Sequence, residues 1–510
     1  MFLSSTPPSV GGAASVKEKA RVSPSASFEA ASIRMVRGAI RADYQWWLGR
    51  ATAPRAVGLE LWVAFMLNRA TGVVRGSTLL MVATLRLGSA HRSVSAFALA
   101  FVFIATATPG QSWSAGPEVG MKITKVNMHE YDDYLPPSVQ IMLDYGMTIE
   151  VGDYESCPWP KAFIEATEKY SSQVELAEDN LALHNYTAGM PFPNIDANDP
   201  AAAWKIMWNH EHKPAFSDDV RTEWVVENMD DRGYVEKMLS SDVWRRLKWE
   251  GRIIHDPKPV IEHEPPMRFT EQWGPIQTPF DLKGTSFLSY RYEEAQRSDD
   301  SWLYLPALRR VRRYSTSDRS GTLFGGDIDQ DSIWGFNSKP EWWDFRLLGQ
   351  REILVPMHTG KYGTLDLWCG TAGTASWVPC VKWEKRKVWL VKGTPERLPV
   401  YAFSKRHLWV DQEVYNVTTS EIFDKAGELW KVWQNTFWCT ESVRDNRRYE
   451  DKRLFTPAIA MIDFQLRHSS RITPPGPANP MEHDWMFEAS EESLNVPEFY
   501  TIASVLNEGR

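Results

Sequence analysis

Apolar and polar positions alternate in short runs from about residue 220 onward, and turn residues such as those at 424–427 separate the runs. In residues 285–294, Leu288, Tyr290 and Tyr292 fall on one face of an extended chain, with polar residues between them. Short runs rich in Val, Tyr, Trp, Phe and Thr are typical of strands. No helical segments lie between the runs to make the crossovers of a parallel sheet. The pattern therefore predicts a mainly β (α+β) fold, in which residues 221–475 form a large curved antiparallel sheet or half-open β-barrel.

Helical spacing is confined to the segments outside this region. Residues 161–176 carry apolar side chains near helical spacing, and Asp199 with Pro200 suits the start of a second helix. We therefore predict a part rich in helices and loops at 116–220, and a C-terminal tail with a short helix at 476–510. Because bare sheet edges promote aggregation, a few of these helices are expected to cover the sheet.

The first 115 residues differ from the rest in charge. They hold 12 basic and 4 acidic residues of the chain's 57 and 65, which leaves 45 and 61, a net charge of −16, for residues 116–510. Within them, His91 and Arg92 precede an apolar run at 95–110, and small residues, Ser114 and Ala115, follow. This order predicts a secretory signal segment at 81–115 that is cut after Ala115, with a buried core helix as the alternative.

Residues 1–80 are predicted to be an over-extended gene start or a disordered leader, because they are poor in acidic residues and lack strand patterning. A membrane anchor through residues 58–67 is the alternative, although ten residues reach only about half of a bilayer's thickness. The remainder of the chain is expected in the periplasm, with association with the outer membrane as a further option.

All four cysteines fall after the expected cleavage point, at Cys157, Cys369, Cys380 and Cys439. Four cysteines in an oxidising compartment can form two disulfides in three ways. Cys369 and Cys380 bracket a short loop rich in turn residues, so this pair is the first disulfide that we expect. Four buried free thiols are the alternative. A zinc site is not expected, because no CxxC spacing occurs.

A basic run and an acidic run lie close together between residues 303 and 336. They consist of Arg309, Arg310, Arg312 and Arg313, and of Asp327, Asp329 and Asp331. On a strand the arginines would alternate between two faces, which prevents a continuous basic stripe. We therefore predict a structural cluster in which these arginines meet these aspartates through charge-assisted hydrogen bonds. An anionic ligand is the alternative, whereas the net negative charge argues against nucleic acid.

The sequence contains no pattern typical of a metal or catalytic site. Counted from Asp327, the sixth and twelfth positions of a calcium-binding loop would be Ser332 and Ser338, where glycine and glutamate are needed. The histidines at 210, 212 and 263 lack the spacing of a zinc-protease helix. No nucleophile elbow, phosphate-binding loop or dinucleotide glycine pattern occurs. We therefore expect no metal, no cofactor and no catalytic residues.

Tryptophan is unusually frequent, with 24 residues in the chain. Several alternate with polar residues on predicted strands, namely Trp383, Trp389, Trp409, Trp430 and Trp433. Each such ring buries about 150–250 Å², so a strand face that carries them forms a large apolar surface. We predict that these five rings line a concave surface that binds a ligand, and a plain hydrophobic core is the alternative.

Four stretches carry a family resemblance, at residues 185–209, 301–313, 329–356 and 401–431. The most specific are LYLPALRRVRR in the second stretch and RHLWVD followed by DKAGELWK in the fourth. They resemble a bacterial exported family known only as domain of unknown function 1329, which is similar to outer-membrane lipoprotein-sorting proteins. The resemblance extends over most of residues 130–475. It implies the fold of periplasmic lipoprotein carriers, a curved half-barrel that shelters acyl chains under helices.

The resemblance and the aromatic surface together predict a periplasmic carrier or accessory protein for a hydrophobic ligand, either lipid-like or a lipoprotein acyl chain. One alternative is an enzyme that acts on hydrophobic substrates through scattered acid and base residues. Another is a non-catalytic periplasmic subunit of an envelope transporter, in which case a transporter or an outer-membrane protein would be the partner. The resemblance brings no catalytic residues with it.

Overall fold

The computed structural model describes residues 116–315, 319–362, 365–398, 400–443, 447–474 and 485–509. The leader expected at 1–80 and the signal segment expected at 81–115 lie outside the described residues. In the part that is described, no helix is both long enough and apolar enough to cross a membrane.

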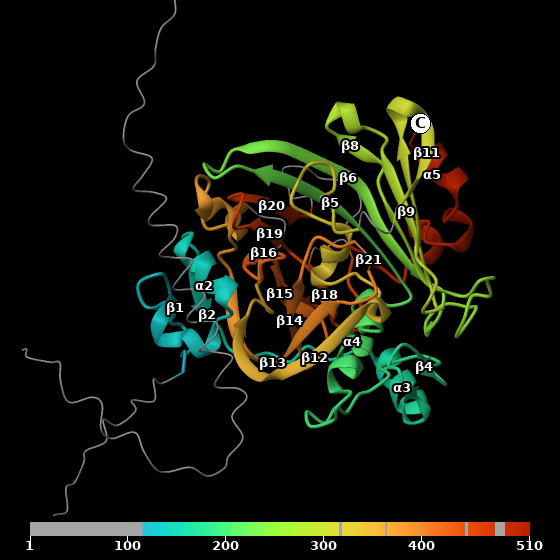
Figure 1. Ribbon diagram of the computed structural model, residues 1–510, viewed down its shortest axis with the longest axis horizontal. Coiled ribbons are helices and arrows are strands. Elements are labelled where there is room, and N and C mark those ends of the chain that lie inside the picture. The colour runs from blue at the N-terminus through green and yellow to red at the C-terminus, as the bar shows by residue number, and fades with distance from the viewer. Residues whose placement is uncertain are drawn as a thin grey trace, which may run out of the picture. The chain divides into compact units, whose positions relative to one another are not determined.

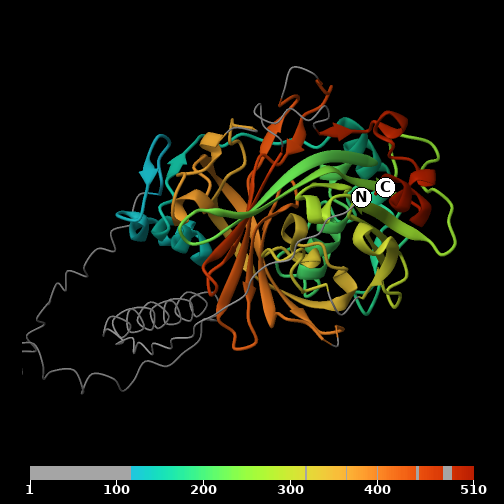
Figure 2. The ribbon, with the colours of Figure 1, turned by 90° about the horizontal axis from the view of Figure 1, so that it is seen from above.

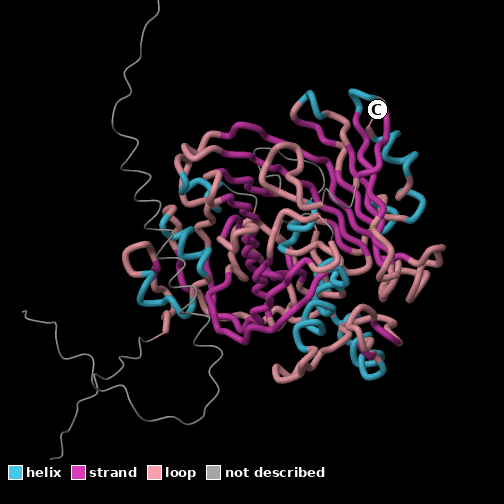
Figure 3. The backbone as a smooth tube through the Cα atoms, in the orientation of Figure 1, coloured by secondary structure: helices cyan, strands magenta, loops and turns pink. Residues whose placement is uncertain are grey.

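Strands form most of the regular structure, and helices lie mainly at their margins (Figure 3). One sheet contains 17 strands, and two further sheets have two strands each. The strands are β1 (Lys122–Ile123), β2 (Ile149–Val151), β3 (Glu175–Leu176), β4 (Leu183–His184), β5 (Asp219–Met229), β6 (Val235–Lys248), β7 (Met267–Trp273), β8 (Ile276–Thr278), β9 (Ser286–Tyr292), β10 (Asp300–Leu305), β11 (Arg310–Tyr314), β12 (Trp343–Val355), β13 (Lys382–Pro395), β14 (Lys405–Asp411), β15 (Val417–Phe423), β16 (Leu429–Asn435), β17 (Trp438–Thr440), β18 (Arg453–Phe455), β19 (Ile459–Asp463), β20 (His468–Thr473) and β21 (Met486–Phe487). The α-helices are α2 (Pro137–Asp144), α3 (Lys161–Tyr170), α4 (Ala202–Glu211) and α5 (Ile502–Glu508).

The short strands β1 and β2 join the large sheet first, where β2 runs parallel to the start of β13, and the two long meanders of the sheet begin and end at its middle. From β5 the chain meanders outward through β6, β7, β9 and β10 to the edge strand β11. It then crosses to the opposite edge, β12, and meanders back through β13, β14, β15, β16 and β19 to β20. β20 pairs with β5, where Ile472 lies opposite Val226. Among the described residues β11 and β12 do not pair, so the sheet is open.

The connection between the two edge strands runs inside the curve of the sheet. Figure 1 shows it in yellow and gold, between the green strands of the first half and the orange strands of the second. Seen from above, the strands of the second half run steeply across those of the first (Figure 2). We call residues 319–342 the crossover segment. Its second part is a core element, since every residue at 327–343 is buried.

Both faces of the second half of the sheet are covered. Trp389 and Val391 of β13 pack in one hydrophobic cluster with the crossover segment, whereas Val388 and Leu390 pack in another with Cys157. Because side chains alternate along a strand, the two pairs lie on opposite faces. A strand buried on both faces is expected to be continuously apolar, and residues 388–391 read VWLV.

Two helices show how the faces are covered. α4 packs on the inner face with the crossover segment, and Ile206 and Met207 are completely buried there. α2 packs at another part of the sheet, where Val139 and Met142 share a separate hydrophobic cluster with Trp383. The predicted fold class is therefore confirmed, because the described residues form one large curved sheet that is not closed and has few helices. Its pairs are antiparallel except for the short parallel contact of β2 with β13.

Two disulfides are present. Cys369 is bonded to Cys380, which is the local pair expected from the sequence, and Cys157 is bonded to Cys439 across 282 residues. The second bond ties the loop before α3 to β17, and it lies in the outer cluster that also contains Trp409.

Candidate binding site

The crossover segment contains only short 3-10 turns, so its buried carbonyl groups need hydrogen bonds from side chains. Arg291 and Arg319 both donate to the carbonyl of Asn337, at 2.7 and 3.1 Å. Lys431 of β16 donates to the carbonyl of Asp327 at 3.1 Å. Charged side chains of β9, of β16 and of the segment itself therefore hold the backbone of this segment in place.

His210 of α4 belongs to the same set of backbone contacts. Its two ring nitrogens lie 2.9 Å from the carbonyl oxygen of Tyr415 and 3.0 Å from that of Phe336. Burial lowers the pKa of His210 to about 3, so the ring is neutral near pH 7 and donates one of the two hydrogen bonds. His210 thus links α4, the crossover segment and the turn between β14 and β15.

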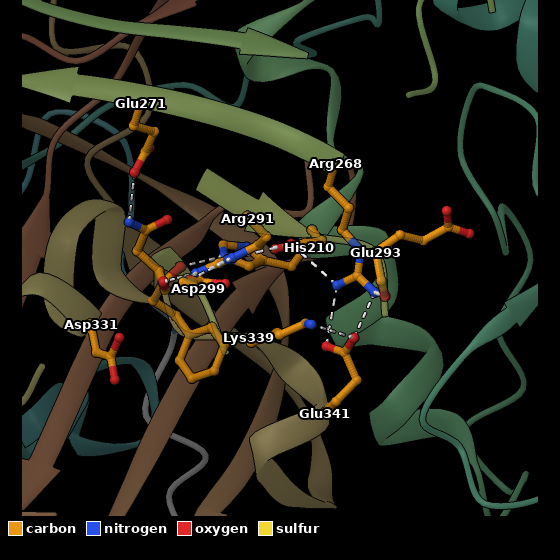
Figure 4. Close-up of polar contacts among 12 residues, drawn as sticks. His210, Arg268, Glu271, Arg291, Glu293, Asp299, Asp331, Lys339 and Glu341 are labelled. Atoms are coloured by element: carbon orange, nitrogen blue, oxygen red, sulfur yellow. Dashed lines mark hydrogen bonds and ion pairs between the residues drawn. The ribbon is translucent and has the colours of Figure 1, made fainter. Parts of the chain in front are cut away.

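A buried network of ion pairs surrounds these contacts (Figure 4). Arg319 is 1% exposed and lies 3.1 Å from Asp299 and 2.6 Å from Asp331. Arg268 forms a 2.6 Å contact with Glu341 at the end of the crossover segment. Charge-assisted hydrogen bonds of this kind are stronger than neutral ones and fix the geometry of both partners.

The network also controls which groups are charged. Burial opposes the ionisation of Glu211, but Arg291, at 3.3 Å, and Arg268 outweigh it and lower the pKa of Glu211 to about 2. Burial lowers the pKa of Lys339 to about 8, and Glu341 opposes that shift. The carboxylates of the network are thus bound by guanidinium groups, and the geometry supports a structural role for them.

The three aspartates predicted to meet the arginine run meet other residues. Asp331 contacts Arg319, Asp329 lies 3.4 Å from Arg406, and Asp327 lies 2.7 Å from Nδ1 of His468.

The predicted cluster of Arg309, Arg310, Arg312 and Arg313 with Asp327, Asp329 and Asp331 is therefore wrong in its partners. The reason is topological: the arginines lie on or beside the edge strand β11 and are exposed, whereas the aspartates follow after the chain has turned inward. Arg313 pairs instead with Asp300 of the neighbouring strand β10.

The five tryptophans predicted to line one ligand surface lie in three different clusters. Trp389 and Trp433 pack on the inner face with Trp430 at the margin, Trp383 packs in a separate cluster with α2, and Trp409 packs near the Cys157–Cys439 disulfide. These rings fill protein cores on both faces of the sheet, and the prediction that they form one ligand surface is wrong. The cause is that both faces of this half of the sheet are covered, so a tryptophan is buried on either face.

A hollow does occur on the inner face, in the first half of the sheet. Most of its wall is apolar and comes from β5 to β8 and from one loop of the crossover segment. The lining residues are Trp224, Val226, Asn228, Leu239, Ser241, Trp244, Trp273, Ile276, Leu323, Phe324, Gly326 and Ile328. We call this cavity the apolar hollow. Its volume is about 40 Å³, and one water needs about 10–15 Å³, so it has room for a few waters or a short apolar group.

Residues 323–328 form the loop over the apolar hollow. Lys237 of β6 donates to the carbonyl of Phe324 at 3.1 Å, and the amide of Leu323 donates to the carbonyl of Ile328 at 2.7 Å. A Cβ atom on Gly326 would lie 2.6 Å from Oδ1 of Asn228, so a larger residue here would displace the Asn228 side chain. The tip of the loop is therefore seated on β5 and β6 by a few contacts, whereas Asp327 anchors its far end to β16 and β20.

Aromatic packing connects the hollow to the buried end of the crossover segment. The ring of Trp334 lies 5.5 Å from that of Trp224 and 4.7 Å from that of Trp244, and both partners line the hollow. Trp334 has a positive φ of 61°, which is unusual for a bulky residue. A Cβ atom on the following Gly335 would lie 2.7 Å from Cγ1 of Val417, so the backbone here fits closely against β15.

A signal for this hollow is present in the sequence, in the first half of the sheet. Trp224, Val226 and Asn228 alternate along β5, which places them on one face of the strand. Leu239 lies directly opposite Val226 on β6. This alternation is shorter than the runs that carry the frequent tryptophans after residue 380, and it is correspondingly easy to miss.

Within the described residues, no group of three or more His, Cys, Asp or Glu side chains is placed to hold a metal ion. Fold and cavity together define a class of protein that is built on one open, curved antiparallel sheet around an internal crossover segment, with an apolar hollow beside it.

The chain belongs to the family described as protein of unknown function (DUF1329), whose sequence model matches residues 122–504. The family resemblance inferred from the sequence is thus confirmed. The chain is 23% identical over 450 residues to PA3922, an uncharacterized protein of Pseudomonas aeruginosa, with 85% of this chain and 92% of the relative covered.

Several solved structures are similar to it. A domain of a candidate outer-membrane lipoprotein-sorting protein from Vibrio parahaemolyticus has a TM-score of 0.40 at 17% identity, covering 59% of this chain and 97% of that one. A DUF1329 family protein from Desulfovibrio piger has a TM-score of 0.37 at 14% identity, covering 57% and 92%.

Proposed function

We propose that this protein is a carrier for a hydrophobic ligand, and that the ligand binds in the apolar hollow when the loop at 323–328 moves outward. The observation that carries the proposal is the chemistry of the wall. It consists of tryptophans and aliphatic side chains, with Asn228 and Ser241 as polar lining residues. Sites for small hydrophobic ligands are typically apolar with a few polar groups that fix orientation.

The size of the hollow requires the loop to move. Sites for small molecules usually enclose about 300–1,000 Å³, and the hollow has about 40 Å³. The rest of the space inside the curve of the sheet is not a second binding site, because the crossover segment and α4 fill it with packed side chains. Loop residues such as Gly325 are exposed, and the contact from Lys237 to Phe324 is a single hydrogen bond. Outward movement of the loop tip at 323–326, with Asp327 kept in place by His468 and Lys431, therefore breaks few hydrogen bonds.

The wall also favours binding over catalysis. General acid–base chemistry needs a titratable side chain within hydrogen-bond reach of the substrate. None of the twelve residues that line the described hollow is titratable in the range of an acid or base catalyst. The buried ion pairs of Arg268, Arg291 and Arg319 hold protein groups instead. A carrier role therefore accounts for the site better than an enzyme acting on hydrophobic substrates.

We place this carrier in the periplasm. Its two disulfides suit an oxidising compartment, and the order of charge and apolar residues at 81–115 is that of a secretory signal. An apolar cargo needs a protein shelter in a water-filled space between membranes, which is the role that we assign.

The test is displacement of a fluorescent fatty acid from the purified protein. Leu239→Trp places a larger ring in the hollow and is expected to weaken probe binding at least tenfold. Leu466→Trp, at a position that is 73% exposed, is the matched control and should bind as the unmodified protein does. Equal binding by both variants, with unchanged urea midpoints, would place the probe elsewhere and overturn the proposed site. Mass spectrometry of an organic extract of the protein then identifies the natural ligand.

A further inference from the structure

Two neighbouring turns at one end of the sheet expose large apolar side chains. Phe280, between β8 and β9, is 91% exposed, and Leu308, between β10 and β11, is 47% exposed. Single exposed apolar residues are common on protein surfaces and need no explanation. Phe280 and Leu308 do need an explanation, because the two turns that carry them lie side by side.

The pairing of β9 with β10 brings the two turns together. Ser286 lies opposite Tyr304, so the residues before Ser286 lie beside those after Tyr304. A Cβ atom on Gly284 would come within 3.1 Å of Cγ of Pro306, which shows how closely the turns approach. Figure 1 shows both turns at the same end of the sheet, beyond β8 and β11.

Basic side chains flank the two apolar tips. Arg309, Arg310 and Arg312 are exposed, and in the part of the chain that the structure describes they pair with no carboxylate. Lys283 and Asp281 are exposed in the first turn, so this turn adds no net charge to the three arginines. Charged residues on an edge strand prevent pairing with other chains. That function accounts for the arginines of β11 but not for the exposed tips of Phe280 and Leu308.

We propose that this end of the sheet docks on the surface of an anionic lipid bilayer. Phe280 and Leu308 enter the boundary between headgroups and acyl chains, where apolar tips of membrane-surface proteins gain their affinity. Arg309, Arg310 and Arg312 bind lipid phosphates, which guanidinium groups recognise through paired hydrogen bonds. Residues 116–510 carry a net charge of −16, so an anionic membrane repels the rest of the surface and selects this end.

The docking surface lies close in the chain to the apolar hollow. Ile276 of β8 lines the hollow, and the first tip begins at Pro279, three residues later. A ligand that leaves the hollow along β8 would meet the membrane at this end. The docking proposal nevertheless stands on the exposed tips and arginines alone, so it can hold even if the hollow binds nothing.

The test is sedimentation of the full-length protein with vesicles, in low salt. The vesicles contain phosphatidylethanolamine with 30% phosphatidylglycerol, or phosphatidylcholine only. Each basic residue close to an anionic surface contributes about fivefold to binding, so Arg309→Gln, Arg310→Gln and Arg312→Gln combined should weaken binding about 100-fold. Phe280→Ser with Leu308→Ser should remove the binding that persists in high salt. All variants share residues 1–115, so any contribution of that segment is common to them.

Two control variants match these changes in charge and apolar area. One combines Arg232→Gln, Arg346→Gln and Arg448→Gln, at arginines whose side chains are 72%, 76% and 76% exposed. The other combines Val126→Ser with Leu466→Ser, at positions 92% and 73% exposed. We expect both controls to bind anionic vesicles within about twofold of the unmodified protein. Absence of vesicle binding, or equal losses in controls and test variants, would overturn the proposal. A third outcome is that no form of the protein binds vesicles, but the arginine variant loses binding to a membrane protein. This outcome would overturn docking on lipid and would assign the surface to an acidic protein.

Discussion

Removal of the Arg319 guanidinium is the sharpest test of the buried network. Arg319 is 1% exposed and contacts Asp299 and Asp331, which are 1% and 0% exposed. Arg319→Met keeps much of the side-chain volume but leaves both carboxylates buried without this cation. Breaking a buried ion pair by removing one partner typically costs about 3–5 kcal/mol, because an uncompensated charge remains in the core. We expect the free energy of unfolding to fall by that amount.

The chain supplies an exposed control for the same substitution. Arg313 pairs with Asp300, but its side chain is 70% exposed. Exposed ion pairs contribute about 0–1 kcal/mol, so Arg313→Met should have a small effect. A second variant, Arg319→Met with Asp331→Asn, removes one buried charge along with its partner and should recover part of the lost stability.

Urea denaturation followed by tryptophan fluorescence measures all four proteins under non-reducing conditions, with slopes compared to confirm that the unfolding transition is unchanged. If Arg319→Met and Arg313→Met differ by less than about 1 kcal/mol, the buried network does not hold the crossover segment, and the structural interpretation of these charges is refuted.

Three further predictions concern the loop and the disulfides. The hydrogen bond with Asp327 raises the pKa of His468, so the protonated ring stabilises the fold below pH 6.5 and this contribution is lost as the pH rises through the folded-state pKa. The urea midpoint should therefore fall between pH 6 and 9, and fall less in His468→Gln. Replacing the Cys157–Cys439 pair by serines should lower the free energy of unfolding by roughly 5 kcal/mol, and replacing Cys369–Cys380 by roughly 3 kcal/mol. The first bond costs more to lose because it closes a span of 282 residues, whereas the second closes a span of 11. Equal urea midpoints for the two variants would contradict this prediction. Gly326→Ala should lower stability by about 1–3 kcal/mol through overlap with Asn228, and an unchanged melting temperature would show that the loop is not seated as described.

The fold class could be predicted because alternation is a local signal. The pattern of residues 285–294 predicts a strand, and β9 occupies Ser286–Tyr292. Alternation states which residues share a face, but it does not state which strand lies next to which. The return of β20 to β5 joins residues about 250 positions apart, and no local pattern records that pairing.

The partners of the buried charges were beyond the reach of the sequence for the same reason. Asp329 meets Arg406, which is 77 residues away, while the dense arginine run much nearer in sequence remains at the sheet edge. Closeness in the sequence therefore led to the wrong arginine partners for these aspartates. The tryptophans misled in a different way, because abundance predicts burial but not whether a ring faces a cavity or a filled core, as Trp409 and Trp244 show.

The most direct test of the carrier account is a crystal structure of the protein with a brominated fatty acid. We predict anomalous bromine density between β5, β6 and the loop at 323–328, with the loop displaced outward and the rings of Trp224 and Trp244 in contact with the ligand. Bromine density confined to the molecular surface, with the loop and the hollow unchanged, would contradict the account.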